Sequence, residues 1–257
     1  MDIGLAGRTA LVPGASSGLG LAIARALAAE GANVVMAARR GDLLRRHAAE
    51  LPSALAVEID ITAPDAARRL VGAAVERFGQ VDVCVLNGGG PAPGTALEAT
   101  DADLLRAVET QLLTHQRLAA AVLPGMRERG WGRLVAVGSA FVQEPAPNMV
   151  GSNTGRAALA AYLKTLAAEV AADGVTVNMV LPGRIDTDRV AHLDREAARR
   201  SGRTPEQVRA DSVARIPVGR LGTPEEFAAV VTFLAGAPAS YVTGSQIRCD
   251  GGLLRAL

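Results

Sequence analysis

The chain has 257 residues, of which 49% are hydrophobic and 21% charged, a composition typical of a globular protein and not of a disordered chain. Its 27 Lys and Arg residues balance 26 Asp and Glu residues, and only 3% of the chain is aromatic. No basic surface for nucleic acid or membranes is therefore expected, and no base-stacking surface. The two cysteines lie far apart, and no cluster has metal-ligand spacing, so no bound metal is expected. The N-terminus lacks the pattern of a signal peptide, and a cytoplasmic protein is therefore predicted.

Strand-like and helix-like patterns alternate along the whole chain. The predicted strands cover 9–12, 33–37, 55–58, 81–86, 133–137, 176–180 and 246–249. The predicted helices cover 19–30, 43–50, 63–78, 102–129, 152–172 and 225–235. This alternation predicts a single α/β domain over residues 1–257, with a doubly wound parallel sheet of about seven strands and helices on both faces.

A glycine-rich loop follows the first predicted strand. Gly14, Gly18 and Gly20 form G-x-x-x-G-x-G directly before a helix. Glycines let the backbone approach a pyrophosphate closely, and the N-terminus of the helix attracts its charge. We expect a dinucleotide here, with a glycine-rich turn that binds nothing as the alternative. The predicted contacts are Gly14, Ser16, Ser17, Gly18, Leu19 and Gly20.

The end of the second predicted strand indicates which dinucleotide is bound. A carboxylate is expected there if the ribose 2′-hydroxyl of NAD is recognised, but the sequence has Ala38, Arg39 and Arg40. Two guanidinium groups can bind a 2′-phosphate. NADP(H) is therefore predicted in preference to NAD(H), although a solvated arginine pair is the alternative.

The segment between Pro182 and Pro224 departs from the regular alternation. It is polar, rich in arginine and irregular, with short helical patterns at 194–201 and 205–215. It follows a strand end, where ligands bind in open α/β sheets. We expect a substrate lid within residues 183–223; a surface excursion that only packs on the edge is the alternative.

Several motifs in this order resemble the short-chain dehydrogenase/reductase family, and 3-oxoacyl-(acyl-carrier-protein) reductase-like members in particular. They are GASSGLG, VEIDIT, LNGGG, GRLVAVGS, VNMVLPGRIDT and YVTG…DGG, and they span nearly the whole chain. The resemblance implies a Rossmann-type fold and a homotetramer or homodimer. It also implies further cofactor contacts from Asp60, Ile61, Asn87, Gly88, Gly89, Arg156, Pro182, Gly183, Ile185 and Thr187.

The catalytic positions depart from the family pattern of Asn, Ser, Tyr and Lys. Ser139 matches the family serine, but Ser152 stands at the tyrosine position and Arg156 at the lysine position. Gln111 replaces the asparagine. The chain has two tyrosines and a single lysine, Lys164, so no Y-x-x-x-K exists anywhere in it.

The remaining residues support part of the chemistry of carbonyl reduction. Ser139 and Ser152 can donate hydrogen bonds to a carbonyl, and Arg156 can bind a ribose, but arginine cannot relay a proton. The proton donor is thus unidentified. Less favoured candidates are His115, His192, Asp186, Asp188 and Glu144.

We predict an NADP-dependent oxidoreductase that interconverts a carbonyl and an alcohol on a small-molecule or acyl substrate. The alternatives are a non-redox enzyme of the same fold, such as a lyase, dehydratase or isomerase, and a cofactor-binding protein without turnover. A homo-oligomer is also expected because the helical segments 102–129 and 152–172 are apolar on more than one side. The residues concerned include Leu118, Ala119, Val122, Leu159, Leu163 and Leu166.

Overall fold

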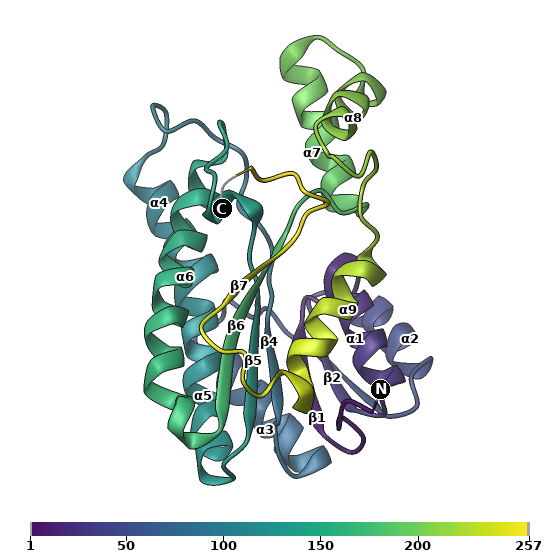
Figure 1. The fold of residues 1–257 in the computed structure, drawn as a ribbon, viewed down its shortest axis with the longest axis vertical. Coiled ribbons are helices and arrows are strands. Elements are labelled where there is room, and N and C mark those ends of the chain that lie inside the picture. The colour runs from purple at the N-terminus through teal and green to yellow at the C-terminus, as the bar shows by residue number, and fades with distance from the viewer. Residues whose placement is uncertain (1, 256–257) are drawn as a thin grey trace.

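The computed structural model describes residues 2–255, which form one seven-stranded parallel sheet between two layers of helices (Figure 1). The strands lie in the order β3-β2-β1-β4-β5-β6-β7. Their bounds are β1 Thr9–Pro13, β2 Asn33–Ala38, β3 Ala54–Glu58, β4 Val83–Leu86, β5 Gly132–Val137, β6 Val175–Pro182 and β7 Gln246–Cys249. The predicted α/β fold with about seven strands is confirmed.

The helices separate into two layers. Helices α3 (Ala66–Phe78), α4 (Asp101–Val108), α5 (Thr114–Glu128) and α6 (Val150–Val170) lie on one side of the sheet (Figure 1). Helices α1 (Gly18–Ala29), α2 (Gly41–Ala49) and α9 (Pro224–Ala235) lie on the other. No helix within residues 2–255 is long and apolar enough to cross a bilayer.

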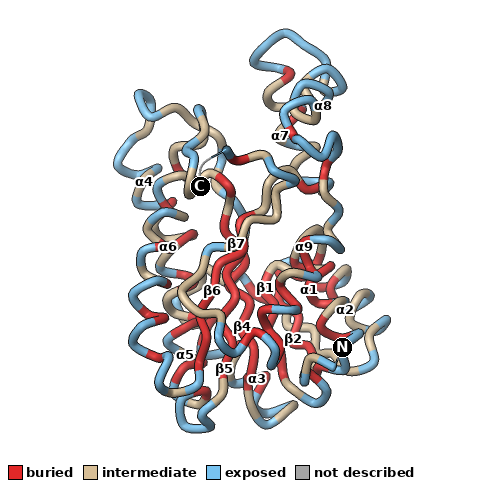
Figure 2. The backbone as a smooth tube through the Cα atoms, viewed as in Figure 1, coloured by how far each residue is buried: buried red, intermediate tan, exposed pale blue. Residues whose placement is uncertain are grey.

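Alternating strand side chains fill two separate cores. In β1, Leu11 packs into the core beneath α3, α5 and α6, whereas Ala10 and Val12 pack into the core beneath α1 and α9. This two-sided burial explains why the strands are nearly continuous apolar sequences. Figure 2 shows the inner strands as the most buried part of the backbone, whereas the edge strands β3 and β7 are only partly buried.

The predicted helix 102–129 is wrong in one respect, because it is not one regular helix. A π-helical turn, Glu109–Leu113, separates α4 from α5. The apolar pattern continues through this turn, which is why periodicity did not reveal it.

Burial also removes the reason given for an oligomer. Leu118, Ala119 and Val122 of α5 are each at most 3% exposed, so the core of the same chain already covers them. Leu159, Leu163 and Leu166 of α6 are at most 8% exposed and are covered by the core of the same chain as well. A homodimer or homotetramer stays a prediction, but these six side chains do not support it.

The α7–α8 segment, residues 183–223, projects beyond the carboxyl end of the sheet (Figure 1). It contains α7 (Asp188–Ser201) and α8 (Pro205–Ala214), so the first helix is longer than predicted. Thr187 and Thr204 cap these two helices with their side chains. Most of the segment is exposed (Figure 2), and only Asp194 and Ala198 of its two helices are buried.

Candidate active site

Most of the sequence-predicted site residues lie in loops or near helix starts at the carboxyl edge of the sheet. Pro182 ends β6, and Gln111 lies in the π turn between α4 and α5. The chain runs outward from β1 toward β3 and from β4 toward β7, so adjacent β1 and β4 form the topological switch point. Open α/β sheets bind ligands at this point. Residues 14–20 follow β1, Arg39 and Arg40 follow β2, and Asp60 and Ile61 follow β3. On the other side of the switch point, Asn87 to Gly89 follow β4, Ser139 follows β5, and Gly183 to Thr187 follow β6.

The glycine loop has a shape that side chains would prevent. Gly14 and Gly18 have φ angles of 66° and 55°. A Cβ atom on Gly20 would lie 2.3 Å from the carbonyl oxygen of Gly14. The Asn87 side chain supports the loop, since its Nδ2 donates to the carbonyl of Pro13 at 2.9 Å.

Helix α1 starts at this loop, and its N-terminal amides are free of side-chain caps and acidic neighbours that would compete with an anion. Ser17, the N-cap residue, makes no side-chain cap bond, and no acidic residue lies in the first turn. The first amides of a helix have no partner within the helix and carry its positive partial charge. Together with the glycines, they fit the pyrophosphate of a dinucleotide.

Arg40 lies across the same loop. Its Nη2 donates to Ser16 Oγ at 2.9 Å and to Ser17 Oγ at 2.6 Å. A guanidinium group and two hydroxyl groups thus meet beside the end of β2, and all three can bind phosphate oxygens.

Arg39 lies near enough to the loop after β3 for its charge to act on Asp60. Asp60 accepts hydrogen bonds from the amide and hydroxyl of Thr62, and these bonds hold the pKa of Asp60 below its usual range, with a smaller effect from Arg39. The two arginines that the sequence grouped together therefore occupy different surroundings.

The loop after β4 has three glycines in a row, Gly88 to Gly90, with polar groups around it. Gln111, from the π turn, is 2% exposed and donates through Nε2 to the carbonyl of Gly89 at 2.8 Å. Single π turns in helices often occur at functional sites. Gln111 thus positions the loop with its side chain.

His115 lies beneath this loop on α5. Its Nδ1 donates to the carbonyl of Gln111 at 2.7 Å, while its Nε2 is buried without a hydrogen-bond partner in the described chain. Burial lowers the pKa of His115 to about 4, and the nearby Arg156 contributes to the lowering. His115 is therefore neutral at physiological pH and cannot deliver a proton as an imidazolium acid.

Ser139 follows β5 with its hydroxyl proton available. Its Oγ accepts a hydrogen bond from the amide of Phe141 at 3.2 Å. Because the oxygen accepts through a lone pair, the proton can still be donated to a substrate. Ser152 is 6% exposed in the first turn of α6.

Arg156 connects α6 to the end of β5. Its Nη1 donates to the carbonyl of Val137 at 3.0 Å and also to that of Gly138, the residue before Ser139. Its Nε is buried without a partner in the described chain. Burial, and secondarily the charge of Arg189, lower the pKa of Arg156 to about 10, so it remains a cation at neutral pH.

Arg189, near the start of α7, was missed as a site residue. Its Nη2 donates to the carbonyl of Pro91 at 2.7 Å. No local signal distinguished it from the other arginines of its segment.

Among the weaker candidates for the proton donor, His192, Asp188 and Glu144 are exposed, and Asp186 is ion-paired with Arg209 at 2.8 Å.

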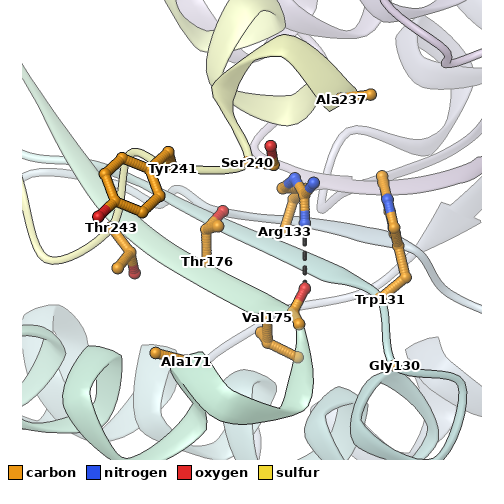
Figure 3. Close-up of a pocket in the computed structure, with 11 residues that line it drawn as sticks. Gly130, Trp131, Arg133, Ala171, Val175, Thr176, Ala237, Ser240, Tyr241 and Thr243 are labelled. Atoms are coloured by element: carbon orange, nitrogen blue, oxygen red, sulfur yellow. Dashed lines mark hydrogen bonds between the residues drawn. The ribbon is translucent and has the colours of Figure 1, made fainter.

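A cavity of about 650 Å³ lies far from these groups, at the amino ends of β5 and β6 (Figure 3). The buried Arg133 guanidinium projects beside it, stacks 4.3 Å from the Trp131 ring centroid and donates to the carbonyls of Gly132, Gly174 and Gly236. These bonds connect the start of β5 to the residue before β6 and to the end of α9. They give Arg133 a structural role.

A glycine-rich loop before a helix at the switch point of a parallel sheet is typical of dinucleotide-binding enzymes such as nicotinamide-dependent oxidoreductases. The chain belongs to the short-chain dehydrogenase/reductase family, and residues 14–254 match the model described as enoyl-(acyl carrier protein) reductase. The resemblance predicted from the motifs is confirmed.

Characterised relatives cover the whole domain. The chain is 34% identical over 250 residues to the 3-oxoacyl-(acyl-carrier-protein) reductase FabG of Vibrio cholerae, covering 97% of this chain and 98% of that one. The L-sorbose reductase of Gluconobacter frateurii, solved with NADPH and L-sorbose, matches with a TM-score of 0.94, 34% identity and 100% coverage of both chains. A variant of actinorhodin polyketide ketoreductase, solved with NADPH, matches with a TM-score of 0.92 and 34% identity, covering 97% of this chain and 98% of that one.

Proposed function

We propose that this chain is an NADP(H)-dependent oxidoreductase that interconverts a carbonyl and an alcohol on a small-molecule or acyl substrate. The observation that carries the proposal is the loop between β1 and α1. Its glycines leave room for a pyrophosphate, and Arg40 lies over Ser16 and Ser17 where a 2′-phosphate needs cationic and hydroxyl partners. The NADPH-bound relatives support the same assignment.

The cofactor would be held by residues from five loops. The pyrophosphate would bind at the Gly14–Gly20 loop, and Arg39 and Arg40 would bind the 2′-phosphate. Asp60 and Ile61 would contact the adenine, and Gly88 and Gly89 would line the centre. Pro182, Gly183, Ile185 and Thr187 would flank the nicotinamide, which supplies or accepts the hydride when bound.

Ser139 and Ser152 would bind the substrate carbonyl. Each hydroxyl can donate to the oxygen, and such donors stabilise the negative charge that develops during reduction. Arg156 would bind the nicotinamide ribose through the buried Nε, which has no partner among the described residues. Its bonds to Val137 and Gly138 would at the same time position Ser139.

None of these groups is a good proton donor at neutral pH. Arg156 stays charged, His115 stays neutral, and a serine hydroxyl is a weak acid. The proton would therefore come from water that enters beside the α7–α8 segment. We propose this segment as the substrate lid.

A non-redox enzyme of this fold is the second candidate. The observation that favours it is the replacement of the family tyrosine and lysine by Ser152 and Arg156. Without that pair, the chain can bind the cofactor and still transfer no hydride.

Two measurements separate these functions. We expect the fluorescence of NADPH to rise when the purified protein binds it, and its absorbance at the nicotinamide band to fall when a carbonyl substrate is added. Binding of NADPH with no hydride transfer to any of a broad panel of aldehydes, ketones and oxoacyl thioesters would favour the non-redox candidate. Absence of NADPH binding would overturn the proposal.

A further inference from the structure

Arg189 connects the α7–α8 segment to the loop after β4. Its Nη2 bonds to the carbonyl of Pro91, 98 residues earlier in the chain, at 2.7 Å. A Cβ atom built on the neighbouring Gly90 would lie 3.3 Å from the same nitrogen. The guanidinium group therefore lies directly over this glycine loop.

Arg189 lies on the part of the loop after β4 that packs near Ser152. Pro91 packs against Gly151, the residue before Ser152, since a Cβ on Gly151 would lie 3.3 Å from Pro91 Cβ. Thr187, by contrast, lies against Gly18 of the pyrophosphate loop. Thr187 and Arg189, at the start of α7, thus lie against two different loops: Thr187 against the loop after β1 and Arg189 against the loop after β4.

Among the described residues Arg189 has no carboxylate partner, whereas several other arginines of the segment have one. Arg184 pairs with Asp194, Arg209 with Asp186, and the same segment pairs Arg199 with Glu196 and Arg203 with Asp211. In the described chain, neither Arg189 nor Arg156 takes part in an ion pair with a carboxylate within 4.0 Å. Both bond only to carbonyl oxygens.

The two cations also act on each other. The charge of Arg189 helps to lower the pKa of Arg156, and burial lowers the pKa of Arg189 itself. Like charges held together without a counterion disfavour their charged forms, and a bound anion removes this cost. The site beside Ser152 is therefore complementary to a negative group.

We propose that the substrate is a small oxo acid, or the matching hydroxy acid, whose carboxylate is bound by the Arg189 guanidinium while its carbonyl faces Ser139 and Ser152. The planar guanidinium offers two parallel donors, which match a carboxylate. This inference rests on the proposed oxidoreductase function and specifies its substrate class.

The test measures binding to the NADPH complex by calorimetry, with 2-, 3- and 4-oxo acids and their methyl esters as probes. An acid of suitable length should bind at least about 10-fold more tightly than its neutral ester, as expected for a charge-assisted contact. Arg189→Met should remove this preference by weakening the binding of the acid to that of its ester. Arg189→Lys should retain part of it.

Controls separate a substrate contact from a cofactor contact. Arg200→Met removes an exposed arginine from the same helix and should leave all affinities unchanged. If Arg189→Met weakens NADPH as much as it weakens the acids, Arg189 binds a cofactor phosphate and the inference fails. Equal affinities for acids and esters in the wild type also overturn it.

Failure of the proposed function gives a different result. Tight acid binding without oxidation of NADPH would leave the carboxylate site intact and reject the oxidoreductase. Turnover of neutral ketones, with no preference for acids, would keep the oxidoreductase and reject the carboxylate site.

Discussion

Arg156 donates to the carbonyl of Gly138, so the residue at the family's lysine position holds the backbone next to Ser139. Loss of the guanidinium would leave two carbonyls without this donor and free the start of the turn that carries Ser139. In the proposed function, the arginine would therefore bind the cofactor and also hold the backbone beside Ser139.

The first prediction separates these two effects. Ser139→Ala should lower the rate of hydride transfer by about 10²–10³-fold, as for the loss of one oxyanion donor, with NADPH affinity unchanged. Arg156→Ala should weaken NADPH binding more than it lowers the rate at saturating NADPH. Single-turnover rates and fluorescence titrations measure the two quantities, and unchanged NADPH affinity in Arg156→Ala would contradict the ribose contact.

Cofactor selectivity should depend on the arginines after β2. Arg39→Ala and Arg40→Ala should each weaken NADPH binding by about 10-fold or more and leave NADH binding nearly unchanged, because only NADPH has the 2′-phosphate. Arg46→Ala, an exposed arginine of α2, is the matched control. Equal affinities for the two cofactors in the wild type would refute NADP(H) preference.

A methyl group in the glycine loop should block the cofactor. In Gly20→Ala the Cβ would lie 2.3 Å from the Gly14 carbonyl, so the loop must move and NADPH affinity should fall at least about 10-fold. Gly72→Ala on α3 meets no atom within 4 Å and should keep full affinity, with a gain in stability of about 0.5–1 kcal/mol. Fluorescence titration and thermal melts measure both effects.

His115 should make the fold sensitive to acid. Its pKa is about 4 in the folded chain and roughly 6.5 when unfolded. Between these values the unfolded chain binds the extra proton, so the free energy of unfolding should fall with falling pH, by on the order of 3 kcal/mol in all.

The control for this prediction is His115→Asn, which keeps a donor for the Gln111 carbonyl and does not titrate. Urea unfolding at pH 7, 6 and 5 should show a steeper loss of stability in the wild type than in this variant. Parallel pH profiles would show that His115 does not have the low pKa.

Arg133 should matter for stability and not for the cofactor. Arg133→Met leaves the carbonyls of Gly132, Gly174 and Gly236 without their donor. The expected loss is about 2–4 kcal/mol of unfolding free energy with unchanged NADPH affinity per folded molecule. Arg46→Met should change stability by less than about 0.5 kcal/mol.

The sheet and the glycine loop were predictable because their signals are local. Strand hydrophobicity and the spacing of Gly14, Gly18 and Gly20 do not depend on distant contacts. The β4 prediction began too early because buried Asp82, which accepts from the amide of Thr9 at 2.8 Å, precedes the strand.

The role of Arg189 could not be predicted because it depends on tertiary contacts. Its partner, Pro91, is far away in sequence, and the surrounding arginines look alike until their carboxylate partners are seen. The surroundings of His115 likewise depend on how α5 packs beneath Gly88.

The π turn between α4 and α5 has a consequence for the phase of the long helical segment. One extra residue in a turn rotates everything after it by about 100° around the helix axis. Deleting a residue within Glu109–Leu113 would restore a regular helix. It would also turn Leu118, Val122 and Met126 away from the core and carry His115 out from beneath Gly88. The π turn thus fixes the rotation of α5, so that Leu118, Val122 and Met126 face the core while His115 lies beneath the loop of the site.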